Sequence, residues 1–195
     1  MRATRDAMNG DGMPDPAAQG VRALNEASVS DARGVFLACC SVTAWADAMV
    51  AARPFANEEA VLDQADAIWR DLGPDDWTQA FAGHPRIGER RAGSAYGGAH
   101  RPSDPRAVGW SQREQSTASS ASDETKTELA RVNAEYEHRF GHIYLVCANG
   151  RSAEELLADA RERMHNDPET ELRVAAEEQR QITRLRLTRL LEGEG

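Results

Sequence analysis

The chain has 195 residues, a length that suits one globular domain, and 41% of them are hydrophobic, with four tryptophans to fill a core. The formal net charge of −9 opposes attraction to nucleic-acid phosphates and to anionic lipid, so we expect no nucleic acid and no membrane as partners. The longest apolar runs, such as residues 35–40, are too short to cross a bilayer or to form a signal-peptide core. These features favour a cytoplasmic protein.

Cysteine content and motifs give no indication of a cofactor. There are three cysteines, two of them adjacent, which is typical of a reducing compartment. The sequence contains no CxxC, HExxH, GxGxxG or Walker motif that would indicate zinc, dinucleotide or nucleotide chemistry. His138 and His142 have the spacing of metal ligands on a helix, but Gly141 should end that helix before His142. We therefore expect no metal site and no cofactor.

The first half of the chain predicts a leader followed by helices. Residues 1–20 contain glycine and proline but few apolar side chains, which predicts a mobile, dispensable leader ahead of one domain over residues 21–195. Apolar side chains at helical spacing then predict four helices, with breaks at Pro54 and at Gly73-Pro74. Their inward faces are Val35, Phe36, Cys39 and Cys40; Trp45, Ala48, Met49 and Ala52; Val61, Leu62, Ala65, Ile68, Trp69 and Leu72; and Trp77 with Phe81.

The second half predicts a surface excursion over residues 90–109, which are rich in glycine and arginine. Helix returns at Ser111, and a longer helix then carries apolar residues from Leu129 to Phe140. Residues 143–147 are apolar and partly β-branched, which predicts a short buried extended segment, and two helices follow near 152–165 and 168–192. A lone strand cannot form a sheet, so we expect an all-α, single-domain multi-helix bundle with that one extended segment.

The first candidate site is His84, at the end of a short helix and immediately before Pro85. Proline forces the preceding residue out of helical geometry, and a rigid histidine at such a point is suited to proton transfer near neutral pH. The alternative is a histidine that interacts only with the last carbonyls of the helix. Arg86 and Glu89 are expected to form a local ion pair.

The second candidate is the segment Ser111–Gln115, which follows Gly109-Trp110. Its S-x-x-E pattern predicts a capping box, with Ser111 at the N-cap and Glu114 reaching back to it. The functional alternative is that the N–H groups of a helix N-terminus bind an anionic substrate. A Glu114 side chain turned towards His84 would instead raise the basicity of the imidazole.

The third candidate is Arg186 in the last helix. At 100° per residue, it falls within the apolar arc of that helix. A charged guanidinium on a buried stripe needs a partner, which would be either a buried glutamate or a substrate carboxylate. The apolar arc consists of Leu172, Ala175, Ala176, Gln179, Ile182, Thr183, Leu187 and Leu190.

Taken together, these segments resemble the 2-oxo-4-hydroxy-4-carboxy-5-ureidoimidazoline (OHCU) decarboxylases of urate degradation, which produce (S)-allantoin. The likeness runs from about residue 30 to 191. It is carried by CCSVTAWADAMVAARPF at 39–55, DDWTQAF at 75–81, HPRIGE at 84–89, SQREQ at 111–115, NAEYEHRFGHIYLVCANGRS at 133–152 and EEQRQITRLRLTRL at 177–190. The resemblance implies an all-helical, cofactor-free enzyme that is usually a homodimer.

The resemblance also implies roles for individual residues. The histidine of the HP motif, here His84, donates a proton, and the glutamate of the S-x-x-E-Q motif, here Glu114, supports it. Arg186 corresponds to a substrate-binding arginine. Polar groups of the substrate are expected to contact Ser111, Gln115, the backbone at Pro85 and the run that starts with Tyr144 and Leu145. The sequence departs from the family pattern in the longer stretch 90–109 and in STASSASDE after Gln115.

The sequence also agrees with two other classes of function. A non-catalytic, ureide-binding helical module would use the same pocket without turnover. A helix-packing interaction protein would use Arg186 and Glu114 only as a structural pair. A hydrolase of the transthyretin type would require a β-sandwich pattern that the sequence lacks.

Overall fold

The computed structural model describes residues 15–87, 104–116 and 121–194, and these residues form nine α-helices. No β-strand occurs in these three ranges, which confirms the predicted all-α class. Of the described helices, none is long and apolar enough to span a membrane. The helices are α1 (Pro16–Glu26), α2 (Val29–Cys39), α3 (Thr43–Ala51), α4 (Glu58–Arg70), α5 (Pro74–Ala82), α6 (Pro105–Glu114), α7 (Asp123–Phe140), α8 (Ala153–Arg163) and α9 (Pro168–Leu191).

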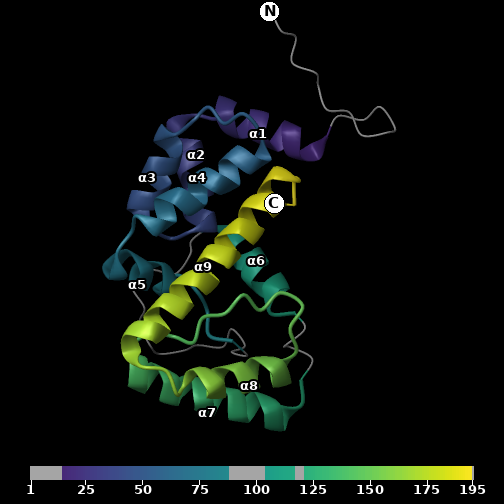
Figure 1. Ribbon diagram of the computed structural model, residues 1–195. Coiled ribbons are helices and arrows are strands. Elements are labelled where there is room, and N and C mark those ends of the chain that lie inside the picture. The colour runs from purple at the N-terminus through teal and green to yellow at the C-terminus, as the bar shows by residue number, and fades with distance from the viewer. Residues whose placement is uncertain (1–14, 88–103, 117–120, 195) are drawn as a thin grey trace, which may run out of the picture.

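Helix α9 runs diagonally through the molecule and links its two ends (Figure 1). Helices α1, α2, α4 and α5 pack along it and, together with α3 and α6, enclose the larger core, which contains Trp45 and Trp110. Helices α7 and α8 pack side by side at the other end and enclose a smaller core around Tyr136 and Leu156. Each large apolar side chain buried in this way stabilises the fold by about 1.5–3 kcal/mol. The predicted stripe on α9, from Ala175 to Leu187, is buried, Arg186 included.

Helix α1 begins at Pro16, inside the range predicted as a leader. Asp15 caps it by accepting a hydrogen bond from the Ala17 N–H at 3.1 Å, and proline is favourable at the first helical position. A Cβ on Gly20 would lie 2.1 Å from the Leu191 carbonyl oxygen, so only glycine lets α1 approach the end of α9 this closely. The leader prediction is therefore wrong for residues 16–20, and residues 1–14 lie outside the described ranges.

Helix α6 begins at Pro105, not at Ser111. Asp104 is its N-cap and accepts a hydrogen bond from the Arg106 N–H at 2.8 Å. The small residues at 107 and 109 weaken the apolar pattern of the first turns, although Ala107 is buried. The predicted excursion is therefore wrong for residues 105–109, and residues 88–103 lie outside the described part of the chain.

The predicted extended segment at 143–147 is not a strand. Residues 143–148 have no regular secondary structure, although Tyr144, Leu145 and Val146 are buried as expected. Gly141 ends α7 in the left-handed conformation at φ 77°, which turns the chain sharply away from the helix. β-branched and apolar residues predicted burial correctly here, but burial alone does not produce a strand when no neighbouring strand is present to pair with it.

Candidate active site

A small pocket lies where the end of α5, the end of α6, the run 143–148 and α9 meet. Seven of the eight predicted site residues line it, from three separate parts of the sequence. The eighth, Arg186, contacts two of those seven. The lining residues are His84, Pro85, Ile87, Ser111, Glu114, Gln115, Tyr144, Leu145, Val146, Ala148 and Ile182.

His84 is held just beyond α5. Gly83 ends the helix, and the His84 backbone N–H donates to the Phe81 carbonyl at 3.0 Å. Burial and the positive charge of Arg186 hold the pKa of the half-buried His84 imidazole well below its ordinary 6.5, although the side chain of Gln179 favours the charged form. The imidazole is therefore neutral at physiological pH and able to accept a proton.

Glu114 and Arg186 form a buried, forked ion pair. The Nε of Arg186 donates to Glu114 Oε1 at 2.9 Å, and its Nη2 donates to Oε2 at 2.9 Å. Only 7% of Glu114 and 3% of Arg186 is exposed. The structure therefore contains the glutamate partner that the sequence left as one alternative for Arg186. The pair lies at the pocket, because Glu114 lines it and Arg186 donates to Glu114.

The capping-box prediction for Ser111 is wrong. Ser111 lies inside α6, and its hydroxyl donates to the Ala107 carbonyl at 2.9 Å and accepts from Arg186 Nη2 at 3.1 Å. The prediction of an anion-binding helix N-terminus fails for the same reason, because residues 111–114 form the C-terminal end of α6, where the helix dipole is negative. The positive charge nearest these residues is that of Arg186, which donates to Ser111 and Glu114.

Two further contacts bring the helix ends together. The Gln115 Nε2 approaches the Pro85 carbonyl oxygen at 3.5 Å, which joins the segment after α6 to the segment after α5. Arg86 forms a forked pair with Glu137 of α7, with one bond of 2.8 Å from its Nη2 to Oε2. The partner predicted for Arg86, Glu89, lies outside the described residues.

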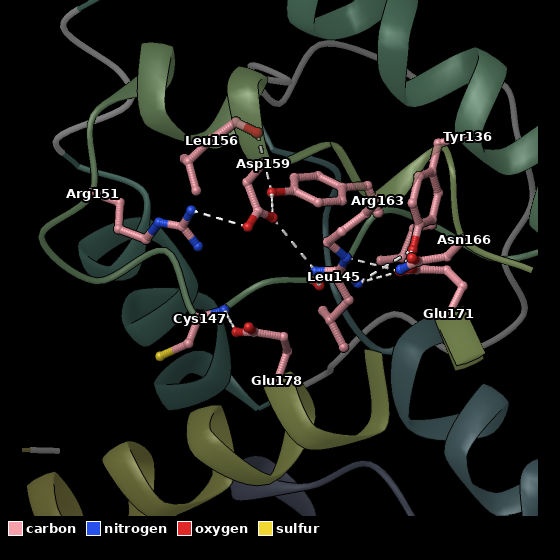
Figure 2. A network of polar contacts seen from close by, with 12 residues as sticks. Tyr136, Leu145, Cys147, Arg151, Leu156, Asp159, Arg163, Asn166, Glu171 and Glu178 are labelled. Atoms are coloured by element: carbon pink, nitrogen blue, oxygen red, sulfur yellow. Dashed lines mark hydrogen bonds and ion pairs between the residues drawn. The ribbon is translucent and has the colours of Figure 1, made fainter. Parts of the chain in front are cut away.

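Side chains of α8 and α9 hold the irregular run that forms one wall of the pocket (Figure 2). The Tyr144 hydroxyl donates to the Leu156 carbonyl at 3.1 Å and to Asp159 Oδ2 at 2.5 Å. The Leu145 carbonyl accepts from Arg163 Nη1 at 3.0 Å. The Cys147 N–H donates to Glu178 Oε2 at 2.7 Å. These bonds replace the strand pairing of a sheet, because they satisfy buried backbone groups and fix the position of the run.

A second buried ion pair, Arg163 with Glu171, lies at the centre of this network and was missed by sequence reasoning. Arg163 Nε donates to Glu171 Oε1 at 2.8 Å, and Glu171 has no exposed surface. Tyr136 and Asn166 also donate to this carboxylate, the latter at 2.7 Å. One signal was available, because Glu171 lies four residues before Ala175 and so extends the apolar stripe of α9.

In the described ranges, no group of three His, Cys, Asp or Glu side chains lies close enough to hold a metal ion. His142 packs instead among aromatic rings, with ring centroids 5.3 Å from Phe81 and 5.6 Å from Tyr136.

Comparison with known proteins gives a consistent result. The family model described as OHCU decarboxylase matches residues 25–188. The uric acid degradation bifunctional protein TTL of Arabidopsis thaliana is 36% identical over 153 residues, which are 78% of this chain and 45% of that protein. The 2-oxo-4-hydroxy-4-carboxy-5-ureidoimidazoline decarboxylase of Mus musculus is 39% identical over 83 residues, 42% of this chain and 47% of the relative. The chain thus spans less than half the length of these curated relatives.

A solved structure supports the same assignment. The crystal structure of OHCU decarboxylase in the presence of (S)-allantoin is 33% identical, with a TM-score of 0.67, and the match covers 81% of this chain and 97% of that one. A structure of (S)-allantoin synthase matches with a TM-score of 0.62 at 15% identity, over 87% of this chain and 53% of that one, which shows a shared fold only. Because the family model matches residues 25–188, which are most of the chain, the protein belongs to the OHCU decarboxylase family.

Proposed function

We propose that this protein converts 2-oxo-4-hydroxy-4-carboxy-5-ureidoimidazoline to (S)-allantoin by decarboxylation, without a metal or cofactor. The observation that carries the proposal is the convergence of His84, Glu114 and Gln115 on one pocket beside Arg186, in a chain of this family. The crystal structure of the solved relative is described as in the presence of (S)-allantoin, which agrees with this product.

The substrate supplies its own electron sink. When the bond between the ring carbon and the carboxylate breaks, CO₂ leaves and the electron pair of that bond is delocalised into the adjacent C=N and C=O groups of the ring. The protein must then add orientation, a proton source on one face, and a pocket that favours the transition state over the bound carboxylate.

His84 fits the role of a group that first accepts and then donates a proton. Its lowered pKa leaves the imidazole neutral in the free protein, so it can take the proton of the substrate hydroxyl as CO₂ departs. The resulting imidazolium then returns that proton to carbon from one side, which gives a single enantiomer, and a proton from water neutralises the negative charge that loss of CO₂ leaves on the ring nitrogen. Arg186 supplies positive charge for the substrate carboxylate, and Glu114 and Ser111 hold the guanidinium in place until substrate arrives.

The test is to add the protein to freshly made urate oxidation product and to follow optical rotation. We expect faster formation of optically active allantoin and release of CO₂, both unaffected by EDTA. Racemic allantoin formed at the uncatalysed rate would contradict the proposal. If (S)-allantoin binds but no CO₂ is released, the protein is a ureide-binding module instead.

We also propose that the protein is a cytoplasmic homodimer with no nucleic-acid or membrane partner. The resemblance to a usually dimeric family and the net charge of −9 support this. Light scattering of the purified chain should give about twice its mass of 21.3 kDa, and a monomer mass at micromolar concentration would contradict it.

A further inference from the structure

Arg189 is a second arginine beside Glu114 that has no role so far. It lies in α9, and its side chain is 14% exposed. Its Nη2 donates to Asn149 Oδ1 at 2.8 Å. Its Nη1 is buried and has no hydrogen-bond partner among the described residues, and it lies 3.7 Å from Glu114 Oε1. A buried donor without an acceptor is costly, so the position of this nitrogen needs an explanation.

The charges around Glu114 provide that explanation. Arg186 occupies both carboxylate oxygens at 2.9 Å, so Arg189 is the excess cation of a group with one negative and two positive charges. If Arg186 turns to a substrate carboxylate, Glu114 loses its forked partner inside the protein. A buried carboxylate without a partner is strongly unfavourable. Arg189 can replace Arg186 if the distance between its Nη1 and Glu114 Oε1 falls from 3.7 Å to about 2.9 Å, the usual length of a charge-assisted hydrogen bond.

We propose that Glu114 exchanges partners during turnover: Arg186 leaves it to bind the anionic substrate, and Arg189 then holds the Glu114 carboxylate in position. This inference rests on the proposed function of the same pocket. Arg189 is a positioning residue, because it acts through Glu114 and does not touch the reacting atoms. Its bond to Asn149 joins it to the residue that directly follows Ala148, which lines the pocket.

Partner exchange also accounts for the excess positive charge. With one carboxylate of the substrate bound, the two arginines face two carboxylates and the group is neutral. Loss of CO₂ moves this negative charge from the carboxylate into the ring, and protonation then neutralises it, so the exchange reverses and Arg186 returns to Glu114. The uncharged product is then held less tightly than the substrate, which favours its release.

The test uses Arg189→Met, Arg189→Lys and a matched control, Arg184→Met. Arg184 lies on the same helix but pairs with Asp66, at 2.7 Å, on the side of α4. The probe is oxonate, a planar ring carboxylate, titrated by calorimetry beside a thermal unfolding curve for each variant. Turnover of the wild-type protein is measured separately.

We expect Arg189→Met to weaken oxonate binding about tenfold or more, the effect of losing one ion pair of this kind, with unfolding temperature close to that of the wild type. Arg189→Lys should recover part of the affinity, and Arg184→Met should bind as the wild type does.

Unchanged oxonate affinity in Arg189→Met would overturn the exchange, as would a lower unfolding temperature with normal affinity, because Arg189 would then only tether Asn149. Failure of wild-type protein to bind oxonate would also overturn it. If wild-type protein binds oxonate and Arg189→Met weakens that binding, the exchange stands even where no CO₂ is formed, and only the proposed reaction fails.

Discussion

Arg163 with Glu171 and Arg186 with Glu114 are the same chemical pair in two different settings. In the first, the carboxylate accepts from Arg163, Tyr136 and Asn166, and Arg163 also donates to a backbone carbonyl. In the second, Glu114 accepts only from Arg186 in the described structure, lines a pocket, and has a second cation 3.7 Å away.

The difference teaches how a structural pair is distinguished from a functional one. Burial and forked geometry are common to both pairs and do not separate them. The two pairs differ in whether the polar groups next to the carboxylate are already hydrogen-bonded to it. At Glu171 they are, so any movement breaks hydrogen bonds inside a packed core. At Glu114 a pocket and a spare guanidinium are available, so Arg186 can change partner at low cost.

The largest effect should come from Arg163→Met. This change leaves Glu171 as a buried charge without its main partner and removes the donor to the Leu145 carbonyl, so we expect a loss of about 3–5 kcal/mol in the free energy of unfolding. Urea denaturation followed by circular dichroism measures it. The matched variant, Arg186→Met, should lose at least about 1 kcal/mol less, because Arg189 can approach Glu114. Equal losses in the two variants would remove the distinction between the pairs.

The next effect concerns His84, which lies beside the pair of Glu114 and Arg186. We expect His84→Asn to lower the rate of CO₂ release by about 10²-fold or more, the usual contribution of a general acid or base. The half-buried side chain after α5 contributes little to packing, so the urea midpoint should stay near that of the wild type. A variant with wild-type rate and an optically pure product would remove His84 from the mechanism.

A smaller effect is expected from Arg186→Lys. Lysine keeps the positive charge but loses the fork that binds Glu114 and a substrate carboxylate, so oxonate affinity should fall about tenfold with little change in stability. Arg163→Lys is the comparison: it should lower stability and leave affinity unchanged in the fraction that remains folded. Wild-type affinity in both Arg186→Lys and Arg186→Met would exclude a binding role for Arg186.

The sequence predicted which residues lie at the pocket, but it did not predict most of the contacts that they make. The helical arc of α9 correctly placed Arg186 inward, because an angular argument needs only the helix and not its neighbours. The capping box at Ser111 failed because the same four letters occur at a helix N-terminus or, as here, near a C-terminus, and only the true start at Pro105 decides between them. The partners of Arg163 could not be predicted for another reason, because Tyr136 and Leu145 lie far from it in sequence. The packing of α7 on α8 brings Tyr136 to Arg163, and the irregular run 143–148 brings the Leu145 carbonyl to it.

The smallest effect is a change in the pKa of His84 that depends on Arg186, the arginine paired with Glu114. Burial and the charge of Arg186 both lower the pKa of His84 from its ordinary 6.5, so the folded protein binds fewer protons here than the unfolded chain does. Stability from this residue is therefore fully present above pH 6.5 and is lost as the pH falls below that value towards the lowered pKa.

Arg186→Met removes one of the two causes, so the pKa of His84 should rise part of the way back towards 6.5, while Arg163→Lys should leave it unchanged. The imidazole C–H resonance, followed by NMR from pH 7.5 downward, measures this directly, and His84→Asn identifies the signal. In the wild type the resonance should stay that of a neutral ring through pH 6, and turnover should not decline there because of His84. A His84 that titrates near 6.5 in wild-type protein would mean that Arg186 does not keep it neutral, and a shift caused equally by Arg163→Lys would mean that charge anywhere in the interior has the same influence.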